Sequence, residues 1–198
     1  MSIEVVKEQV KKFLSSNAPE VLAIKGDWGV GKTYTWNQYL SEFKSEISMH
    51  RYSYVSLFGI NSLNDLKFTI FENSVKKEII GENASIETFK ENATSLIEKL
   101  GRKSSTFLSK NPFTKGFAPA IESVSFLSLS NTIVCLDDME RKGDKLEVKE
   151  ILGLISLLKE QKKCKVVLLL NDNEDCIKDY KKYREKVVDL ELEFLPTS

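Results

Sequence analysis

The sequence predicts an α/β fold, a three-layer α/β/α sandwich with a mostly parallel sheet of five strands. Two observations lead to this prediction. Short apolar runs, typical of strands buried on both faces of a parallel sheet, alternate with segments whose apolar residues recur at helical spacing. A glycine-rich segment, residues 26–33, joins the first apolar run to the next helical segment. Strands and helices that alternate in this way form a parallel sheet covered on both faces.

The first third of the chain predicts helix, strand, helix, strand and helix in that order. Residues 1–18 are expected to form an amphipathic helix, and residues 21–24 a buried strand. The helix after the glycine-rich segment has an apolar face made of Trp36, Tyr39, Leu40 and Phe43. Residues 52–57 are rich in β-forming types. Ser62 and Asp65 have the spacing of a capping box, so a helix is expected to begin there.

The middle of the chain interrupts this alternation. Apolar residues at helical spacing predict a helix over residues 86–100, and residues 101–130 read as an irregular insertion, because they contain several glycines and prolines. A buried strand then follows at residues 132–136. We expect one domain over residues 1–198, with this insertion inside it.

The last third predicts a helix near residues 148–158, a buried strand at 166–170, a charged helical stretch and a final strand at 188–194. In that final strand apolar residues alternate strictly with Asp189, Glu191 and Glu193. Alternation means that one face is in contact with water, so this strand is expected near a sheet edge.

The composition gives no support to some classes of partner. Lysine plus arginine number 29 and aspartate plus glutamate also number 29, so the charge does not indicate nucleic acid. No apolar run approaches the roughly 20 residues that cross a bilayer. The three cysteines form no CxxC pair, which favours reduced thiols in the cytoplasm.

The segment Gly-Asp-Trp-Gly-Val-Gly-Lys-Thr at residues 26–33 matches GxxxxGK[ST], the Walker A pattern of phosphate-binding loops. Glycines let the loop curl so that backbone N–H groups face phosphate oxygens, and the helix that follows adds its positive end. Lys32 is predicted to reach the β- and γ-phosphates, and the Thr33 hydroxyl to bind Mg²⁺. The predicted nucleotide contacts are Gly26, Asp27, Trp28, Gly29, Val30, Gly31, Lys32, Thr33 and Tyr34.

Two carboxylates end the strand at residues 132–136, as in a Walker B motif. A phosphate-binding loop needs a carboxylate at the end of a neighbouring strand to hold the Mg²⁺ shell, and Asp137 is predicted to do so directly or through a water. Asp138 is then placed to polarise the attacking water as catalytic base. A capping role for Asp138 is the alternative.

Two further polar residues are candidates. Asn171 ends the strand at 166–170 and is predicted either to hydrogen-bond the γ-phosphate or the attacking water, or to cap a helix or turn. Arg141 follows the acidic pair. It is expected either to meet a phosphate in a neighbouring subunit or, more commonly for such an arginine, to form a surface ion pair with Glu140 or Asp144.

Three segments together resemble the KAP family of P-loop NTPases. They are GDWGVGKT at 26–33, SLFG at 56–59 and DDMER at 137–141. The family shows G-x-W-G-x-G-K-T, a strand running into SLFG, and DD-L-[ED]-R, so Met139 departs from the pattern. Trp28 is the most specific mark, because a plain Walker loop does not require it; packing under the loop is its alternative role. The resemblance covers residues 18–195.

The resemblance implies the sheet order 5-1-4-3-2, with strands numbered along the chain, and ATP with Mg²⁺ as cofactors. No guanine-selecting Asn-Lys-x-Asp is present, since residues 171–174 read Asn-Asp-Asn-Glu. The wider additional-strand group includes AAA+ proteins and the signalling NTPases with numerous domains. Many members act as oligomeric switches, and many bacterial ones resemble phage-defence proteins, so self-association or a partner protein is expected.

The chain departs from the family in two places. Many KAP proteins carry transmembrane helices between the two Walker motifs, and residues 101–130 contain no such span. The helical lid expected after the last strand is absent, so low intrinsic activity is expected of the isolated domain.

These features leave two functions open. The first is a Mg²⁺-dependent ATP-binding and ATP-hydrolysing motor or switch that controls assembly or an effector; Asp138 favours it. The second is a nucleotide-binding interaction module with negligible turnover, which the missing lid favours. A small-molecule kinase is less favoured, because no acceptor-binding signature accompanies the acidic pair. A nucleic-acid motor has no support from the even charge.

Overall fold

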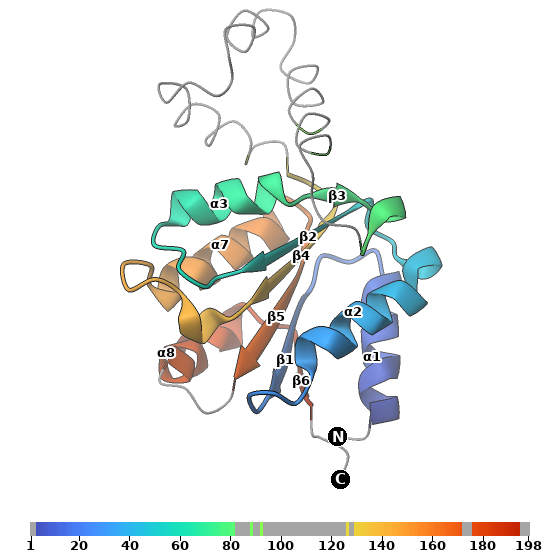
Figure 1. The fold of residues 1–198 in the computed structure, drawn as a ribbon, viewed down its shortest axis with the longest axis horizontal. Coiled ribbons are helices and arrows are strands. Elements are labelled where there is room, and N and C mark those ends of the chain that lie inside the picture. The colour runs from blue at the N-terminus through green and yellow to red at the C-terminus, as the bar shows by residue number, and fades with distance from the viewer. Residues whose placement is uncertain are drawn as a thin grey trace, which may run out of the picture.

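The computed structural model describes residues 3–81, 88, 92, 126, 129–171 and 176–194. Its centre is a six-stranded sheet in the order β3-β2-β4-β5-β1-β6 (Figure 1). The strands are β1 (Val21–Gly26), β2 (Arg51–Ser56), β3 (Val75–Lys76), β4 (Thr132–Asp137), β5 (Lys165–Asn171) and β6 (Leu190–Glu193). Neighbouring strands are parallel except for the antiparallel pair of β2 and β3.

The predicted α/β fold and strand order are confirmed. The five predicted strands lie in the order β6-β1-β5-β4-β2, and β5 separates the strand before the glycine-rich loop from the strand that ends in Asp137. The prediction missed β3. This strand has only two residues, Val75 and Lys76, too few to show an alternating pattern.

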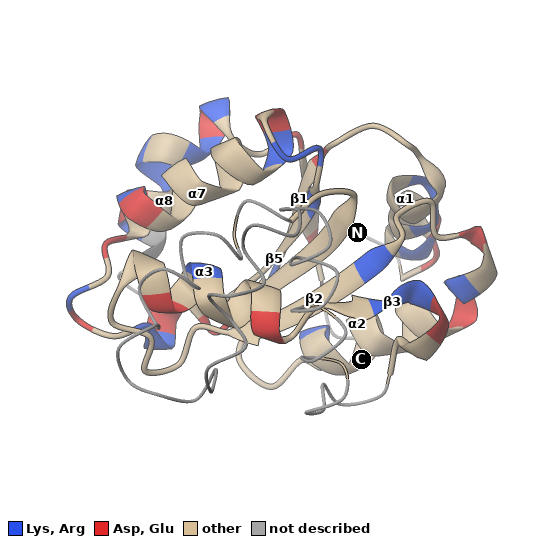
Figure 2. Cartoon of the chain, turned by 90° about the horizontal axis from the view of Figure 1, so that it is seen from above, with Lys and Arg blue, Asp and Glu red and all other residues tan. Residues whose placement is uncertain are grey.

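Helices cover both faces of the sheet (Figures 1 and 2). The helices are α1 (Ile3–Ser15), α2 (Lys32–Glu42), α3 (Leu63–Glu72), α7 (Val148–Glu160) and α8 (Cys176–Tyr183). Short 3₁₀ turns are η1 (Lys44–Glu46), η2 (Lys77–Ile79), η4 (Met139–Arg141) and η5 (Arg184–Lys186). Helices α1 and α2 lie on one face, and α3, α7 and α8 lie on the other. Charged residues of both signs are interspersed on α1, α7 and α8 in Figure 2.

Two hydrophobic clusters fill the space between the layers. Along β1, Val21 and Ala23 belong to the cluster under α3 and α7, and Leu22 and Ile24 belong to the cluster under α1 and α2. Successive side chains of a strand point to opposite faces, so a strand covered on both sides must be apolar at every position. The same alternation in β4 and β5 explains why the sequence shows them as continuous apolar runs.

The alternating strand is at the sheet edge, as predicted. β6 pairs only with β1 among the strands described; Leu192 is buried, and Glu191 forms an ion pair of 2.7 Å with Lys25. The predicted cap of α3 is also present, since the Ser62 hydroxyl accepts a hydrogen bond of 3.1 Å from the backbone N–H of Asp65.

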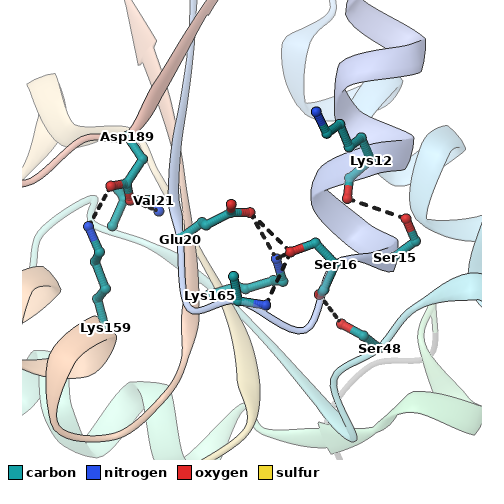
Figure 3. Close-up of polar contacts among 10 residues, drawn as sticks. Lys12, Ser15, Ser16, Glu20, Val21, Ser48, Lys159, Lys165 and Asp189 are labelled. Carbon is teal, nitrogen blue, oxygen red and sulfur yellow. Dashed lines mark hydrogen bonds and ion pairs between the residues drawn. The ribbon is translucent and has the colours of Figure 1, made fainter.

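Polar contacts connect the segments at the amino ends of the central strands, opposite the glycine-rich loop (Figure 3). Lys165, at the start of β5, has a fully buried side chain, and its ammonium lies 3.2 Å from the Glu20 carboxylate and 3.3 Å from the Ser16 hydroxyl. Asp189 accepts hydrogen bonds from the Val21 N–H at 2.8 Å and from Lys159 at 2.6 Å. These contacts hold β1, β5 and β6 in register, so their carboxyl ends meet at one edge.

The predicted helix at 86–100 and the insertion at 101–130 lie almost wholly outside the described residues, apart from single positions such as Asn92 and Phe126. Among the residues that the structure does describe, no helix has both the length and the apolar character needed to cross a membrane.

Candidate functional site

The glycine-rich loop connects the end of β1 to the start of α2. Gly29 and Gly31 have φ angles of 79° and 88°, a region that residues with a Cβ rarely adopt. Gly26 is glycine for a different reason: a Cβ there would lie 2.6 Å from the backbone oxygen of Phe194, which follows β6. The loop therefore depends both on backbone freedom and on the close approach of the edge strand.

The amino end of α2 faces this loop. Gly31 occupies the N-cap position, and no side chain caps the helix. An uncapped N-terminus leaves backbone N–H groups and the positive end of the helix dipole available to an anion. The Lys32 ammonium donates to the backbone oxygens of Gly26 at 2.8 Å and Asp27 at 2.9 Å, so it lies over the loop rather than away from it.

The acidic strand end lies next to the first turn of α2. The Thr33 hydroxyl donates a hydrogen bond of 2.7 Å to Oδ2 of Asp137, although the two residues are 104 positions apart. Asp137 is only 7% exposed, and its Oδ1 accepts the backbone N–H of Asp138 at 2.8 Å. The two residues predicted to hold the metal are therefore in direct contact.

Asp138 has a different environment from the one that a capping role requires. It stands at the N-cap position of η4 with a left-handed backbone, φ 56°, but its side chain makes no capping hydrogen bond. Instead Oδ2 of Asp138 accepts a hydrogen bond of 2.6 Å from the Ser56 hydroxyl at the end of β2. The alternative capping role predicted for Asp138 is therefore wrong.

Tyr54 contacts a site residue, Asp137, and sequence reasoning missed this role. Its hydroxyl donates a hydrogen bond of 2.9 Å to Oδ2 of Asp137, the same oxygen that accepts from Thr33. Burial first, and then the nearby Asp137 carboxylate, raise the pKa of the Tyr54 phenol above its ordinary value, so the hydroxyl stays a donor. No signal in the sequence indicated this role, because an aromatic residue in a strand is usually explained by packing.

A cavity of about 260 Å³ brings most of the predicted site together. It is lined by Trp28, Gly29, Gly31, Lys32, Thr33, Tyr34, Asp137, Asp138, Glu140, Leu169 and Asn171. Of the predicted contacts, Gly26, Asp27 and Val30 do not line it, and Val30 packs against the hydrophobic cluster under α1 and α2. Asn171 is buried at the end of β5, while the residues after it, 172–175, lie outside the described part, so its capping alternative is untested.

A second cavity is larger, about 640 Å³, and shares Thr33 with the first. Among the described residues, its lining also includes Tyr54 but contains no glycine of the loop, neither carboxylate of the acidic pair and no charged side chain. Size alone would favour it, whereas the chemistry needed to bind a phosphate lies in the smaller cavity. We therefore assign the candidate site to the smaller one.

Glu140 also lines the site and was not predicted as a member. Burial first, and also the neighbouring carboxylates of Asp138 and Asp137, raise the pKa of Glu140 above its ordinary value. Its position two residues after Asp138 could have suggested it, but only the turn η4 directs it toward the cavity.

The exposure of Trp28 and the contacts of Arg141 differ from those predicted. Trp28 is 61% exposed, so the interpretation that it packs under the loop is wrong. The Arg141 guanidinium lies 5.5 Å from the centre of the Trp28 ring and 4.1 Å from that of Phe58. These are cation–π contacts, and no ion pair of Arg141 is found in the described part of the chain, so the expected surface ion pair is not observed.

The residues present fit a magnesium–nucleotide complex. Thr33 and Asp137 offer hard oxygen ligands, and the uncapped helix end offers N–H donors to phosphate. No cluster of three or more metal-binding side chains occurs within the described ranges. This composition suits Mg²⁺, which keeps several waters and takes substrate phosphates beside one or two protein ligands.

Comparisons with known proteins extend only to the fold. No family model and no curated protein sequence matches the chain. Its structure is similar to that of the Orc1 protein of Aeropyrum pernix, solved in complex with DNA, with 13% identity, a TM-score of 0.53, and coverage of 98% of this chain and 45% of that one. It is also similar to Cdc6p from Pyrobaculum aerophilum, with 15% identity, a TM-score of 0.51, and coverage of 98% and 45%.

The chain thus spans less than half of the length of these two proteins. At such low identity the similarity concerns the path of the backbone and not the activity. The chain has an α/β fold with a mostly parallel six-stranded sheet, similar in the path of its backbone to these two proteins.

Proposed function

We propose that this chain is a Mg²⁺-dependent ATP-binding and ATP-hydrolysing domain that acts as a motor or switch for an assembly or an effector. One observation supports this most strongly: the Thr33 hydroxyl, on the first turn of the helix after the glycine-rich loop, contacts the Asp137 carboxylate in the cavity that Lys32 also lines. A phosphate-binding loop and a metal-binding carboxylate have to meet in this way for phosphoryl chemistry.

In this proposal each residue has a distinct task. Backbone N–H groups of the loop and Lys32 bind the phosphates, while Thr33 and Asp137 hold Mg²⁺, which would supply charge neutralisation at the β- and γ-phosphates. Asp138 accepts a proton from the attacking water. Asn171, at the end of β5, orients that water or the γ-phosphate.

The choice of ATP, a KAP-like identity and a role in phage defence are narrower proposals. These narrower proposals rest on the three segments GDWGVGKT, SLFG and DDMER, together with the lack of a guanine-selecting motif. A second copy of the chain, or a partner protein, would control turnover.

A second candidate is a nucleotide-holding module with negligible turnover. It is favoured by the contacts that already engage the reactive groups: Lys32 donates to the loop's own carbonyl oxygens, and Ser56 donates to Asp138. Both contacts would have to rearrange or be shared before these side chains act on a substrate.

The test measures ATP binding and phosphate release with Mg²⁺ over a range of protein concentrations. Lys32→Ala is expected to abolish binding, and Lys12→Ala, which changes an exposed lysine of α1, is the matched control. Asp138→Asn is expected to keep ATP binding and to lower turnover by about 10²–10⁴-fold, the range for a general base.

The outcomes separate the two candidates. Specific activity that rises with protein concentration supports an assembling ATPase. Binding without turnover supports the holding module. Equal ATP binding by the wild-type chain and Lys32→Ala would contradict both.

A further inference from the structure

The Asp137 carboxylate is almost fully occupied by hydrogen bonds from this chain. Oδ2 accepts from Thr33 at 2.7 Å and from Tyr54 at 2.9 Å, and Oδ1 accepts the backbone N–H of Asp138 at 2.8 Å. An ionised carboxylate has about four acceptor positions. Within the described residues, three are used, and the remaining one is on Oδ1.

The two donors to Oδ2 are not equivalent. The Thr33 hydroxyl can bind a metal ion with a lone pair while its hydrogen still points to Asp137. Tyr54 comes from β2, on the far side of Asp137 from the loop, and lines the second cavity rather than the candidate site. Its hydroxyl therefore holds the Asp137 carboxylate on the side away from the glycine-rich loop and adds nothing to phosphate binding.

We propose that Tyr54 is a positioning residue: by filling the second acceptor position of Oδ2, it prevents Asp137 from ligating the metal directly through that oxygen and leaves Oδ1 to act through an intervening water. This inference rests on the proposed function, because it concerns the Mg²⁺ of the nucleotide complex. It goes further by naming a residue that selects the metal.

Selection between Mg²⁺ and Mn²⁺ follows from the free-energy cost of removing bound water from each ion. Mg²⁺ loses its waters reluctantly, so a carboxylate restricted to contact through water suits it. Mn²⁺ accepts direct carboxylate ligation more readily. Tyr54→Phe removes one hydroxyl, keeps the ring and returns one acceptor position to Oδ2, so direct ligation through Oδ2 becomes possible and Mn²⁺ gains relative to Mg²⁺.

The expected size of the effect comes from other metal sites. There, loss of a residue that hydrogen-bonds a metal ligand typically changes the affinity for the metal by about 10–100-fold. For Tyr54→Phe we expect Mg²⁺ affinity in the ADP complex to fall by about 10-fold. Mn²⁺ affinity should fall much less or rise. A tyrosine that only packs against its neighbours would change both affinities by the same factor, so the ratio of the two is the informative quantity.

The experiment titrates Mg²⁺ and Mn²⁺ separately into wild type, Tyr54→Phe and the control Tyr180→Phe, each with ADP. Tyr180 is a matched control because its hydroxyl also donates to a carboxylate, Glu191 of the edge strand β6, at 3.0 Å. A changed Mn²⁺-to-Mg²⁺ ratio in Tyr54→Phe alone supports the inference. Equal ratios in all three proteins overturn it.

A second measurement uses the wild-type chain alone and so does not depend on how well Tyr54→Phe folds. Electron–nuclear double resonance on the Mn²⁺·ADP complex, with ¹³C-carboxyl-labelled aspartate, distinguishes direct from water-mediated contact. Weak coupling supports the inference, and the strong coupling of a directly bound carboxylate overturns it. If wild type bound no ADP with either metal, the proposed function would fail and this inference with it, whereas unchanged ratios with tight ADP binding would refute Tyr54 alone.

Discussion

The Ser56 hydroxyl donates a hydrogen bond of 2.6 Å to Oδ2 of Asp138, although the two residues are 82 positions apart in the chain. The contact exists because β2 and β4 are neighbouring parallel strands and Ser56 pairs in register with Asp137. Two residues of β2, Tyr54 and Ser56, therefore each hold one carboxylate of the acidic pair.

Ser56→Ala is expected to lower kcat for ATP hydrolysis by about 10-fold. Without the hydrogen bond from Ser56, the Asp138 carboxylate spends less time in the orientation that it has here. ATP affinity should change little, since Ser56 does not line the candidate site. Steady-state phosphate release and equilibrium ATP binding check the two values. The control is Ser156→Ala on α7, where a half-buried serine also donates to a carboxylate, Glu160. Unchanged kcat in Ser56→Ala would show that the contact has no role in turnover.

Arg141→Ala is expected to alter the fluorescence of Trp28, since it removes the guanidinium that lies 5.5 Å from that ring. The free energy of unfolding should fall by about 0.5–1 kcal/mol, the range for an exposed cation–π contact. Emission spectra and urea unfolding measure the two effects. Lys142→Ala serves as the neighbouring control. A spectral change that persisted in a Trp28→Phe background would have to come from Trp36, contrary to this prediction.

Glu140→Gln is expected to stabilise the protein at neutral pH. The folded state raises the pKa of Glu140, so it binds that proton more tightly than the unfolded chain does. Stability is then lost as pH rises from the ordinary value of 4.5 through the raised pKa. Glutamine cannot lose the proton, so its Tm advantage should be present at pH 7 and shrink toward pH 4.

Thermal unfolding between about pH 4 and 8 follows this difference. Glu72→Gln, at an exposed position at the end of α3, is the control. A Tm advantage of Glu140→Gln that stayed constant over this range would mean that the carboxyl group is not the cause.

Glu20→Gln is expected to destabilise the fold by about 1–3 kcal/mol. This change leaves the fully buried Lys165 ammonium without its carboxylate, and the partial exposure of Glu20 keeps the loss below the 3–5 kcal/mol typical of fully buried pairs. Lys165→Met, which removes the charge itself, should be nearly neutral or stabilising. Chemical denaturation compares the two. If Lys165→Met were less stable than Glu20→Gln, the ion pair would be shown to contribute net stability.

Local patterns explain most of what could be predicted. Trp36, Tyr39 and Leu40 are buried on one face of α2, as their helical spacing predicts, and Ser62 caps α3. The final strand lies at the edge because its alternating residues leave one face in contact with water. Periodicity and capping act within a few residues of the chain, so they can be recognised in the sequence before the fold is known.

Other features depend on which strands become neighbours. β3 is too short to carry a pattern, and Glu140 reaches the cavity only because η4 turns it there. Trp28 has an exposed ring that contacts Arg141, and no pattern within the glycine-rich loop could distinguish this from burial beneath it.

The sequence by itself determined the order of the strands other than β3 and of the described helices, the glycine-rich loop with Lys32 and Thr33, and a strand that ends in Asp137 and Asp138. Tertiary structure alone decided that Thr33 contacts Asp137, and that Tyr54 and Ser56 each hold one of the two carboxylates. The physical reason is distance along the chain. A hydrogen bond of less than 3 Å between residues 82 to 104 positions apart exists only once the order and register of the parallel strands are set.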